Sequence, residues 1–111
     1  MTAVKPVILS LLLVVSVIPA QSTRKFTGTI TDSMCPAGDH SRMRMGSTDA
    51  ECTIACNDAH GAPYVLYDGK DVYGLSDQKT PGKFAGKKVA VTGTLNTKSK
   101  TIQVRSITAS N

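Results

Sequence analysis

Apolar and polar residues alternate along two long stretches of the chain, residues 24–31 and 87–95. In the first stretch Phe26 and Ile30 lie on one side, and lysine and threonine residues lie on the other. This period of two is typical of a half-buried β-strand. Shorter runs rich in β-branched and aromatic residues lie between and after these stretches. The pattern predicts five strands, at residues 24–31, 63–68, 71–75, 87–95 and 101–108.

Two local features refine the strand prediction. Asp68 and Gly69 separate the second and third strands, and an Asp-Gly pair supplies the positive φ angles of a tight hairpin turn. In the last strand Ile102 and Val104 point inward, whereas Ile107 falls out of phase with them. The shift predicts a bulge or the end of strand pairing.

Capping signals predict two helical segments. The Thr48 hydroxyl can accept a hydrogen bond from the Glu51 amide, while the Glu51 side chain returns to the Thr48 amide. A helix over residues 49–60 follows, and a glycine ends it. A single helical turn is predicted at residues 80–86, with Thr80 as its cap and proline at its first position.

The order of these elements is strand, loop and helix, strand, strand, short helix, strand, strand. A small sheet must protect its edge strands, and closure into a barrel does so. We therefore predict a mainly β fold, a small five-stranded OB-like barrel with one helix between strands 1 and 2 and a short helix before strand 4. The predicted domain covers residues 23–111.

The start of the chain has the composition of a leader. Lys5 precedes an unbroken stretch of apolar or small residues over 7–18, which ends near Ala20 and Ser22. These features are typical of a secretory signal peptide. A membrane span needs about 20 apolar residues, which is more than this stretch offers. We predict a signal peptide at residues 1–22 and an exported protein, periplasmic or secreted, with no membrane span after cleavage.

Charge and aromatic content narrow the choice of partners. The formal net charge is +5, but the basic residues are scattered in pairs, whereas a nucleic-acid groove gathers them beside aromatic side chains. The second and third strands carry Tyr64, Tyr67 and Tyr73, where OB barrels often stack bases, although tyrosines in small barrels commonly pack in the core or at the rim. We expect a monomer without a nucleic-acid partner. The sequence has no paired carboxylates, Ser-His-Asp arrangement or phosphate loop, which argues against an enzyme.

All cysteine and histidine residues of the chain fall within residues 35–60. Exported thiols tend to be oxidised, and with three cysteines one disulfide leaves one thiol over. A bond from Cys35 to Cys52 or to Cys56 would close a ring of roughly 20 residues and stabilise the fold by roughly 3 kcal/mol in the chain-entropy model. A bond between Cys52 and Cys56 within one helix is the poorest option, since a disulfide restricts the Cβ directions.

The same residues form a candidate metal site. Three thiolates and an imidazole suit tetrahedral Zn²⁺, or Cu⁺ with methionines as further ligands. His40 stands in a polar loop, where a histidine is ordinarily exposed to solvent. Asp32 is expected to form the turn after the first strand. In a metal site it would act only indirectly, as a carboxylate that hydrogen-bonds to a ligand. The candidate ligands are Cys35, His40, Cys52, Cys56 and His60, the last three spaced i, i+4, i+8 along one helix face.

Five short segments of the chain form a characteristic set. They are Thr29–Cys35 (TITDSMC), Cys52-x-x-x-Cys56, Tyr64–Leu66 (YVL), Phe84–Val89 (FAGKKV) and Val91–Leu95 (VTGTL). Together they resemble a family of small exported bacterial proteins of unknown function, whose members have one OB-like barrel after a signal peptide. The resemblance implies the fold and the location, and it brings no activity. That family usually has a glycine where this chain has Pro36.

Three functional hypotheses follow from these observations. The first is an exported, non-enzymatic binding or interaction module, stabilised by a Cys35-containing disulfide, for a small ligand or a component of the cell envelope. The second is a protein that binds Zn or Cu through the Cys/His cluster. The third is a thiol redox protein, in which Cys52, near the helix start, is the best-placed reactive thiol. The disulfide and the metal site both require folding to bring Cys35 against the helix face that carries the other cysteines.

Overall fold

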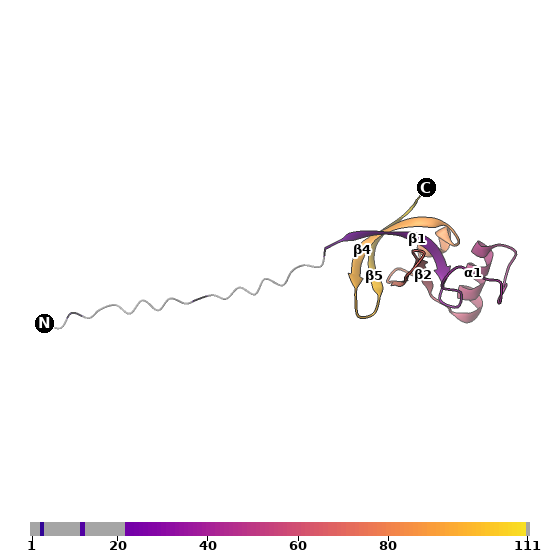
Figure 1. Ribbon diagram of the computed structural model, residues 1–111, viewed down its shortest axis with the longest axis horizontal. Coiled ribbons are helices and arrows are strands. Elements are labelled where there is room, and N and C mark those ends of the chain that lie inside the picture. Colours follow the sequence, from indigo (N-terminus) through magenta and orange to yellow (C-terminus); the bar gives the residue numbers. More distant parts are fainter. Residues whose placement is uncertain (1–2, 4–11, 13–21, 111) are drawn as a thin grey trace.

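The structure is a computed structural model that describes Ala3, Leu12 and residues 22–110 (Figure 1). The predicted signal peptide, residues 1–22, lies outside the described residues apart from Ala3, Leu12 and Ser22. None of the helices in the described part combines the length and the apolar character needed to cross a membrane.

Five strands in the described part of the chain form one sheet. They are β1 (Arg24–Asp32), β2 (Tyr64–Tyr67), β3 (Val72–Leu75), β4 (Lys88–Asn96) and β5 (Thr101–Ala109). The strand order is β1-β2-β3-β5-β4, and β4 pairs in turn with β1, so the sheet closes on itself. All pairs are antiparallel except β3 with β5, which run parallel. The mainly β prediction with these five strands is confirmed.

The inward-facing side chains of the sheet form one hydrophobic core. Phe26 and Ile30 of β1 are buried, as the alternating pattern predicted, and Val89 and Val91 of β4 are buried with them. Each fully buried aliphatic side chain contributes about 1.5–3 kcal/mol relative to an exposed one. The core residues are Phe26, Ile30, Tyr64, Leu66, Leu75, Val89, Val91 and Ile102.

Of the tyrosines considered for base stacking, one belongs to this core and a second packs against it. Tyr64 is buried. The ring of Tyr73 packs against the core, with its centroid 5.4 Å from that of Phe26 and a tilt of 57° between the rings. Both rings therefore contribute to packing.

A bulge interrupts the pairing of β4 with β5, as the phase of Ile107 predicted. Val91 lies opposite Ile107, whereas Gly93 lies opposite Val104, so β5 carries one extra residue between these pairs. A Cβ atom at Gly93 would collide with the carbonyl oxygen of Gln103. Glycine is therefore required where the two strands approach each other most closely.

The helix α1 (Asp49–His60) has the predicted bounds. Thr48 Oγ1 accepts a hydrogen bond from the Glu51 amide at 3.1 Å, and Gly61, at φ 64°, ends the helix. The main return bond differs from the prediction, because the Glu51 carboxylate accepts from the Ser47 amide at 2.8 Å, one residue before Thr48. The Glu51 carboxylate thus binds the backbone at Ser47, the residue before the N-cap of the helix.

The short helix before β4 is a 3-10 helix, η1 (Pro81–Phe84). Its predicted cap was wrong, because the Thr80 side chain makes no capping hydrogen bond. The Asp77 carboxylate accepts from the Thr80 amide at 3.0 Å instead. Gly86, at φ 73°, follows η1, and its amide donates to the Ile30 carbonyl at 2.8 Å, which fixes this segment to β1.

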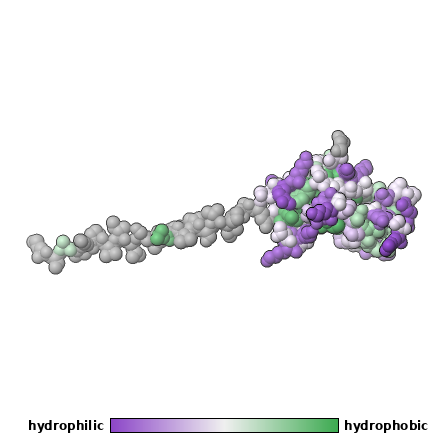
Figure 2. All heavy atoms as spheres, viewed as in Figure 1, coloured by the Kyte–Doolittle hydropathy of each residue, from purple (hydrophilic) through white to green (hydrophobic). Residues whose placement is uncertain are grey.

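The helix α1 and the loop before it lie together at the end of β1, to one side of the closed sheet (Figure 1). The helix packs on β1. On the face that Figure 2 shows, hydrophilic residues are spread over the closed sheet and over the segment formed by the loop and α1, with smaller apolar areas among them. The candidate chemistry is therefore concentrated at one end of the molecule.

Candidate metal centre

The site begins with the turn that follows β1. Asp32 Oδ1 accepts hydrogen bonds from the backbone amides of Met34 and Cys35, each at 3.0 Å. The chain reverses within this turn, and Cys35 pairs back with Asp32 as an isolated bridge. The Thr31 hydroxyl donates to the Cys35 carbonyl at 2.8 Å, which secures the reversal. The turn occupies Oδ1 and leaves Oδ2 of this buried carboxylate for another partner.

That partner is His40, which is buried with only 2% of its surface exposed. Its Nε2 lies 3.1 Å from Asp32 Oδ2, and its Nδ1 lies 3.3 Å from Asp49 Oδ1. Thr53 Oγ1, also buried, lies 3.4 Å from Nε2. The expectation that this loop histidine would be exposed was wrong, because α1 supplies polar partners that cover it.

Asp32, Cys35 and His40 together form a compact cluster of ligand atoms. One carboxylate oxygen, the sulfur and one ring nitrogen all lie within 4.8 Å of one another, and all three residues are buried. We call these three residues the cluster. A small cavity of about 40 Å³ lies beside it, with His40, Asp49 and Thr53 in its lining.

Burial and negative charge act on two of the thiols. Burial raises the pKa of Cys35, and the neighbouring charges of Asp32, Asp39 and Cys52 raise it further. Burial also raises the pKa of Cys56, together with the charge of Asp32, the charge of Cys35 and a side-chain hydrogen bond with Asp32. Cys56 is therefore influenced by Asp32 and Cys35, although it is not a member of the cluster.

Cys52 faces a different neighbour. Its thiol donates to the Gly46 carbonyl at 3.2 Å, although it is as fully buried as Cys56. The predicted approach of Cys35 to the cysteines of α1 stays a prediction, since neither Cys52 nor Cys56 joins the cluster. The three cysteines of the chain, all in the described part, are free thiols here, and the predicted Cys35 disulfide is not among the bonds of this structure.

His60 stands apart from the other candidate ligands. It is the last residue of α1 and is exposed, whereas Cys52 and Cys56 on the same helix are buried. The i, i+4, i+8 spacing puts Cys52, Cys56 and His60 on one face of the helix, but the rest of the protein buries only the two cysteines on that face. His60 does not join the cluster.

Two members of this site were not predicted from the sequence, and the role of a third was underestimated. Asp32 was expected to form a turn, which it does, but its second oxygen also faces the centre of the cluster. Asp49 and Thr53 were not singled out. Their spacing of four residues on α1, beside two buried cysteines, is the signal that could have indicated a shared partner on that face.

Comparisons of the chain with protein-family models, with curated proteins and with solved structures found no match. The family resemblance drawn from the five segments stays a prediction.

Proposed function

We propose that this protein is an exported, non-enzymatic OB-type barrel that binds one transition-metal ion, Zn²⁺ or Cu⁺. Export rests on the composition of residues 1–22. The OB assignment is supported by the closed order β1-β2-β3-β5-β4, by the parallel pairing of β3 with β5 and by the short helix between β3 and β4.

The observation that carries the metal proposal is the cluster itself. A carboxylate, a thiol and an imidazole, all buried, have their ligand atoms within 4.8 Å of one another. Around a tetrahedral ion with nitrogen and oxygen ligands at 2.0–2.1 Å, adjacent ligand atoms lie about 3.3 Å apart. The separation of 3.1 Å between His40 Nε2 and Asp32 Oδ2 is close to that value. Cys56 lies outside this group of three, and we propose it as the fourth ligand because Asp32 and Cys35 both raise its pKa.

The surroundings of His40 support the same proposal. When a histidine binds a metal through one ring nitrogen, its other nitrogen usually donates to a carboxylate or carbonyl, which fixes the ring. Asp49 stands in that position, 3.3 Å from Nδ1, while Nε2 faces the cluster. The carboxylate of Asp49 is 62% exposed and remains well hydrated. The imidazole is therefore oriented before any ion arrives.

The ligand set defines the class of ion. Two thiolates, one imidazole and one carboxylate favour Zn²⁺ or Cu⁺ over Ca²⁺ and Mg²⁺, which prefer oxygen ligands alone. Because burial and adjacent negative charge raise the pKa of Cys35 and Cys56, both thiols hold a proton until an ion displaces it.

Replacement of the two histidines tests the proposal. The full chain is expressed in a bacterial host, purified from the periplasm under reducing conditions, and titrated with Zn²⁺ against a chromophoric chelator. We expect one equivalent of Zn²⁺ in the parent protein and in His60→Gln, and at least a tenfold weaker affinity in His40→Gln. Circular dichroism checks that both variants fold. Equal affinities in the two folded variants would refute the site.

The second candidate function is the disulfide-stabilised binding module, and one observation favours it. Cys35 and Cys56 are both buried, and Cys35 is among the groups that raise the pKa of Cys56. Oxidation in the periplasm would join two of the proposed metal ligands and exclude the ion. Thiol counting on protein purified without reductant separates the two functions, because one free thiol without metal supports the module and three thiols with one metal ion support the centre.

A further inference from the structure

The loop between β1 and α1 carries an unusual concentration of exposed methionine. Three of the four methionines of the chain lie in residues 34–45, and Met34, Met43 and Met45 are 39%, 40% and 39% exposed. A methionine side chain is apolar enough to be buried in most proteins. Solvent exposure of three thioethers in one short loop therefore calls for an explanation other than core packing.

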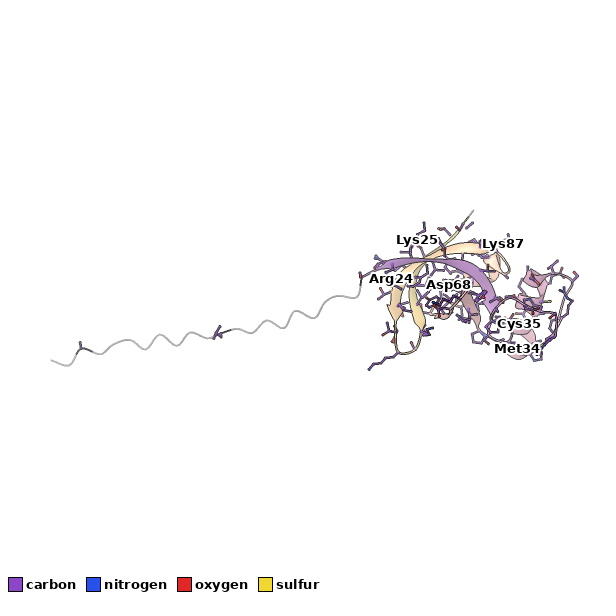
Figure 3. All side chains as sticks on the ribbon, viewed as in Figure 1. Arg24, Lys25, Met34, Cys35, Asp68 and Lys87 are labelled. Atoms are coloured by element: carbon purple, nitrogen blue, oxygen red, sulfur yellow. The ribbon has the colours of Figure 1, made fainter. Side chains whose placement is uncertain are left out.

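Two of these methionines share a surface hollow with a member of the cluster. The hollow has a volume of about 280 Å³, and its lining includes Met34, Cys35 and Met43. Met34 and Cys35 lie side by side at the end of β1, next to α1 (Figure 3). Cys35 is thus the residue common to the hollow and to the buried cluster, with 9% of its surface exposed. Met45 is outside the lining of this hollow.

We propose that this hollow is a loading port for Cu⁺, in which the thioethers of Met34 and Met43 bind the ion first and the sulfur of Cys35 passes it to the cluster. This proposal rests on the proposed metal-binding function, and it names the soft ion Cu⁺ as the ion that is bound. Thioether and thiolate sulfur are ligands that select Cu⁺, whereas Zn²⁺ and harder ions gain little from a thioether.

The transfer is an exchange of ligands without oxidation or reduction. Cu⁺ enters the hollow on the two thioethers, the Cys35 thiol loses its proton to solvent, and a copper–sulfur bond forms. Bonds from copper to His40 and Cys56 then replace the bonds to the methionines, with loss of the Cys56 proton. Copper remains Cu⁺ throughout. The route needs no large opening, because Cys35 borders both the hollow and the cluster.

Two charged residues also line the hollow. Asp39 and Arg42 belong to its lining, so one carboxylate and one guanidinium accompany the sulfurs. The Ser41 amide donates to Asp39 Oδ1 at 3.0 Å, which orients this carboxylate. The negative charge of Asp39 attracts a cation to the hollow, and the guanidinium in the same lining partly offsets that attraction.

The rate of copper loading tests the port. The full chain, purified from the periplasm and kept reduced and anaerobic, is mixed with the coloured Cu⁺–bicinchoninate complex, and the loss of colour is followed in time. The double variant Met34→Leu/Met43→Leu keeps the apolar bulk and removes both thioether ligands. Met45→Leu is the matched control, from the same loop and with the same exposure. We expect loading to be at least tenfold slower in the double variant and unchanged in the control.

Zn²⁺ binding separates failure of the port from failure of the centre. If the double variant loads Cu⁺ as fast as the parent, or if Met45→Leu slows loading equally, the port is overturned while the centre stands. A parent protein that binds Zn²⁺ but not Cu⁺ overturns the port alone. A parent protein that binds neither ion overturns both. Slower Cu⁺ loading with unchanged Zn²⁺ affinity in the double variant supports the port.

Discussion

Replacement of Asp32 by asparagine isolates the polar contact at the centre of the site. Asparagine keeps a carbonyl oxygen for the amides of Met34 and Cys35, so the turn after β1 is retained. It puts an amide nitrogen in place of Oδ2, and the negative charge that faces His40 Nε2 at 3.1 Å is lost. The change therefore removes one buried charge and leaves the local backbone in place.

The size of the effect follows from burial. The side chains of Asp32 and His40 are 0% and 1% exposed, so water does not compensate for the lost charge. A hydrogen bond to a charged group contributes about 1.5–3 kcal/mol. The second partner of the ring, Asp49, remains, and this keeps the loss below the 3–5 kcal/mol that is typical when a buried ion pair is broken. We expect the free energy of unfolding of the metal-free protein to fall by about 2 kcal/mol, or the Tm by about 10 °C.

Asp49→Asn is the matched control, because it applies the same substitution to the other carboxylate on the same ring. The Asp49 side chain is 62% exposed, so its contact with Nδ1 is screened by water. Its loss should cost about 1 kcal/mol at most. Urea unfolding with chelator present, followed by circular dichroism, gives both values. The role of burial would be refuted if Asp32→Asn lowered the free energy of unfolding no more than Asp49→Asn does.

Three further predictions test other parts of the account. Gly93→Ala should lower the free energy of unfolding by about 1–3 kcal/mol, because its Cβ meets a carbonyl of β5, and an unchanged urea midpoint would contradict the close approach. Hydrogen bonds from Thr80 lower the pKa of Asp77, so the ionised Asp77 carboxylate stabilises the fold above pH about 4 and this stabilisation is lost on further acidification. Asp77→Asn should therefore reduce the loss of folding stability at acidic pH, and an unchanged pH dependence would contradict this role of Asp77. Metal binding should release about two protons, from Cys35 and Cys56, so the logarithm of the apparent Zn²⁺ affinity should rise by about 2 per pH unit between about pH 6 and 8. A pH-independent affinity would exclude thiolate ligands.

The strands and helices were predictable because their signals are local. The alternation around Phe26 and Ile30 fixes which face of β1 is buried, and Thr48 with Gly61 marks the two ends of α1. The out-of-phase position of Ile107 likewise located the bulge. Each of these features depends on residues within a few positions of one another, so the sequence contains the whole signal.

The site was only partly predictable because it depends on contacts between distant segments. The presence of Cys35, His40 and Cys56 indicated candidate ligands, but the loop that carries His40 has no apolar periodicity from which burial could be inferred. Its burial arises from Asp49 and Thr53 on α1, which lie 9 and 13 residues further along the chain. Spacing along a helix predicts a shared face, but not how much of that face the fold buries, and this is why His60 is exposed while Cys52 and Cys56 are buried.

X-ray absorption at the metal edge of the protein loaded with one equivalent of Zn²⁺ tests the central claim most directly. The account predicts a four-coordinate ion with two sulfur ligands at about 2.3 Å and two nitrogen or oxygen ligands at about 2.0–2.1 Å. The His40→Gln variant should lose the imidazole signature, whereas His60→Gln should keep it. A shell of oxygen atoms alone, or a spectrum that is identical in both variants, would contradict a centre built on Asp32, Cys35 and His40.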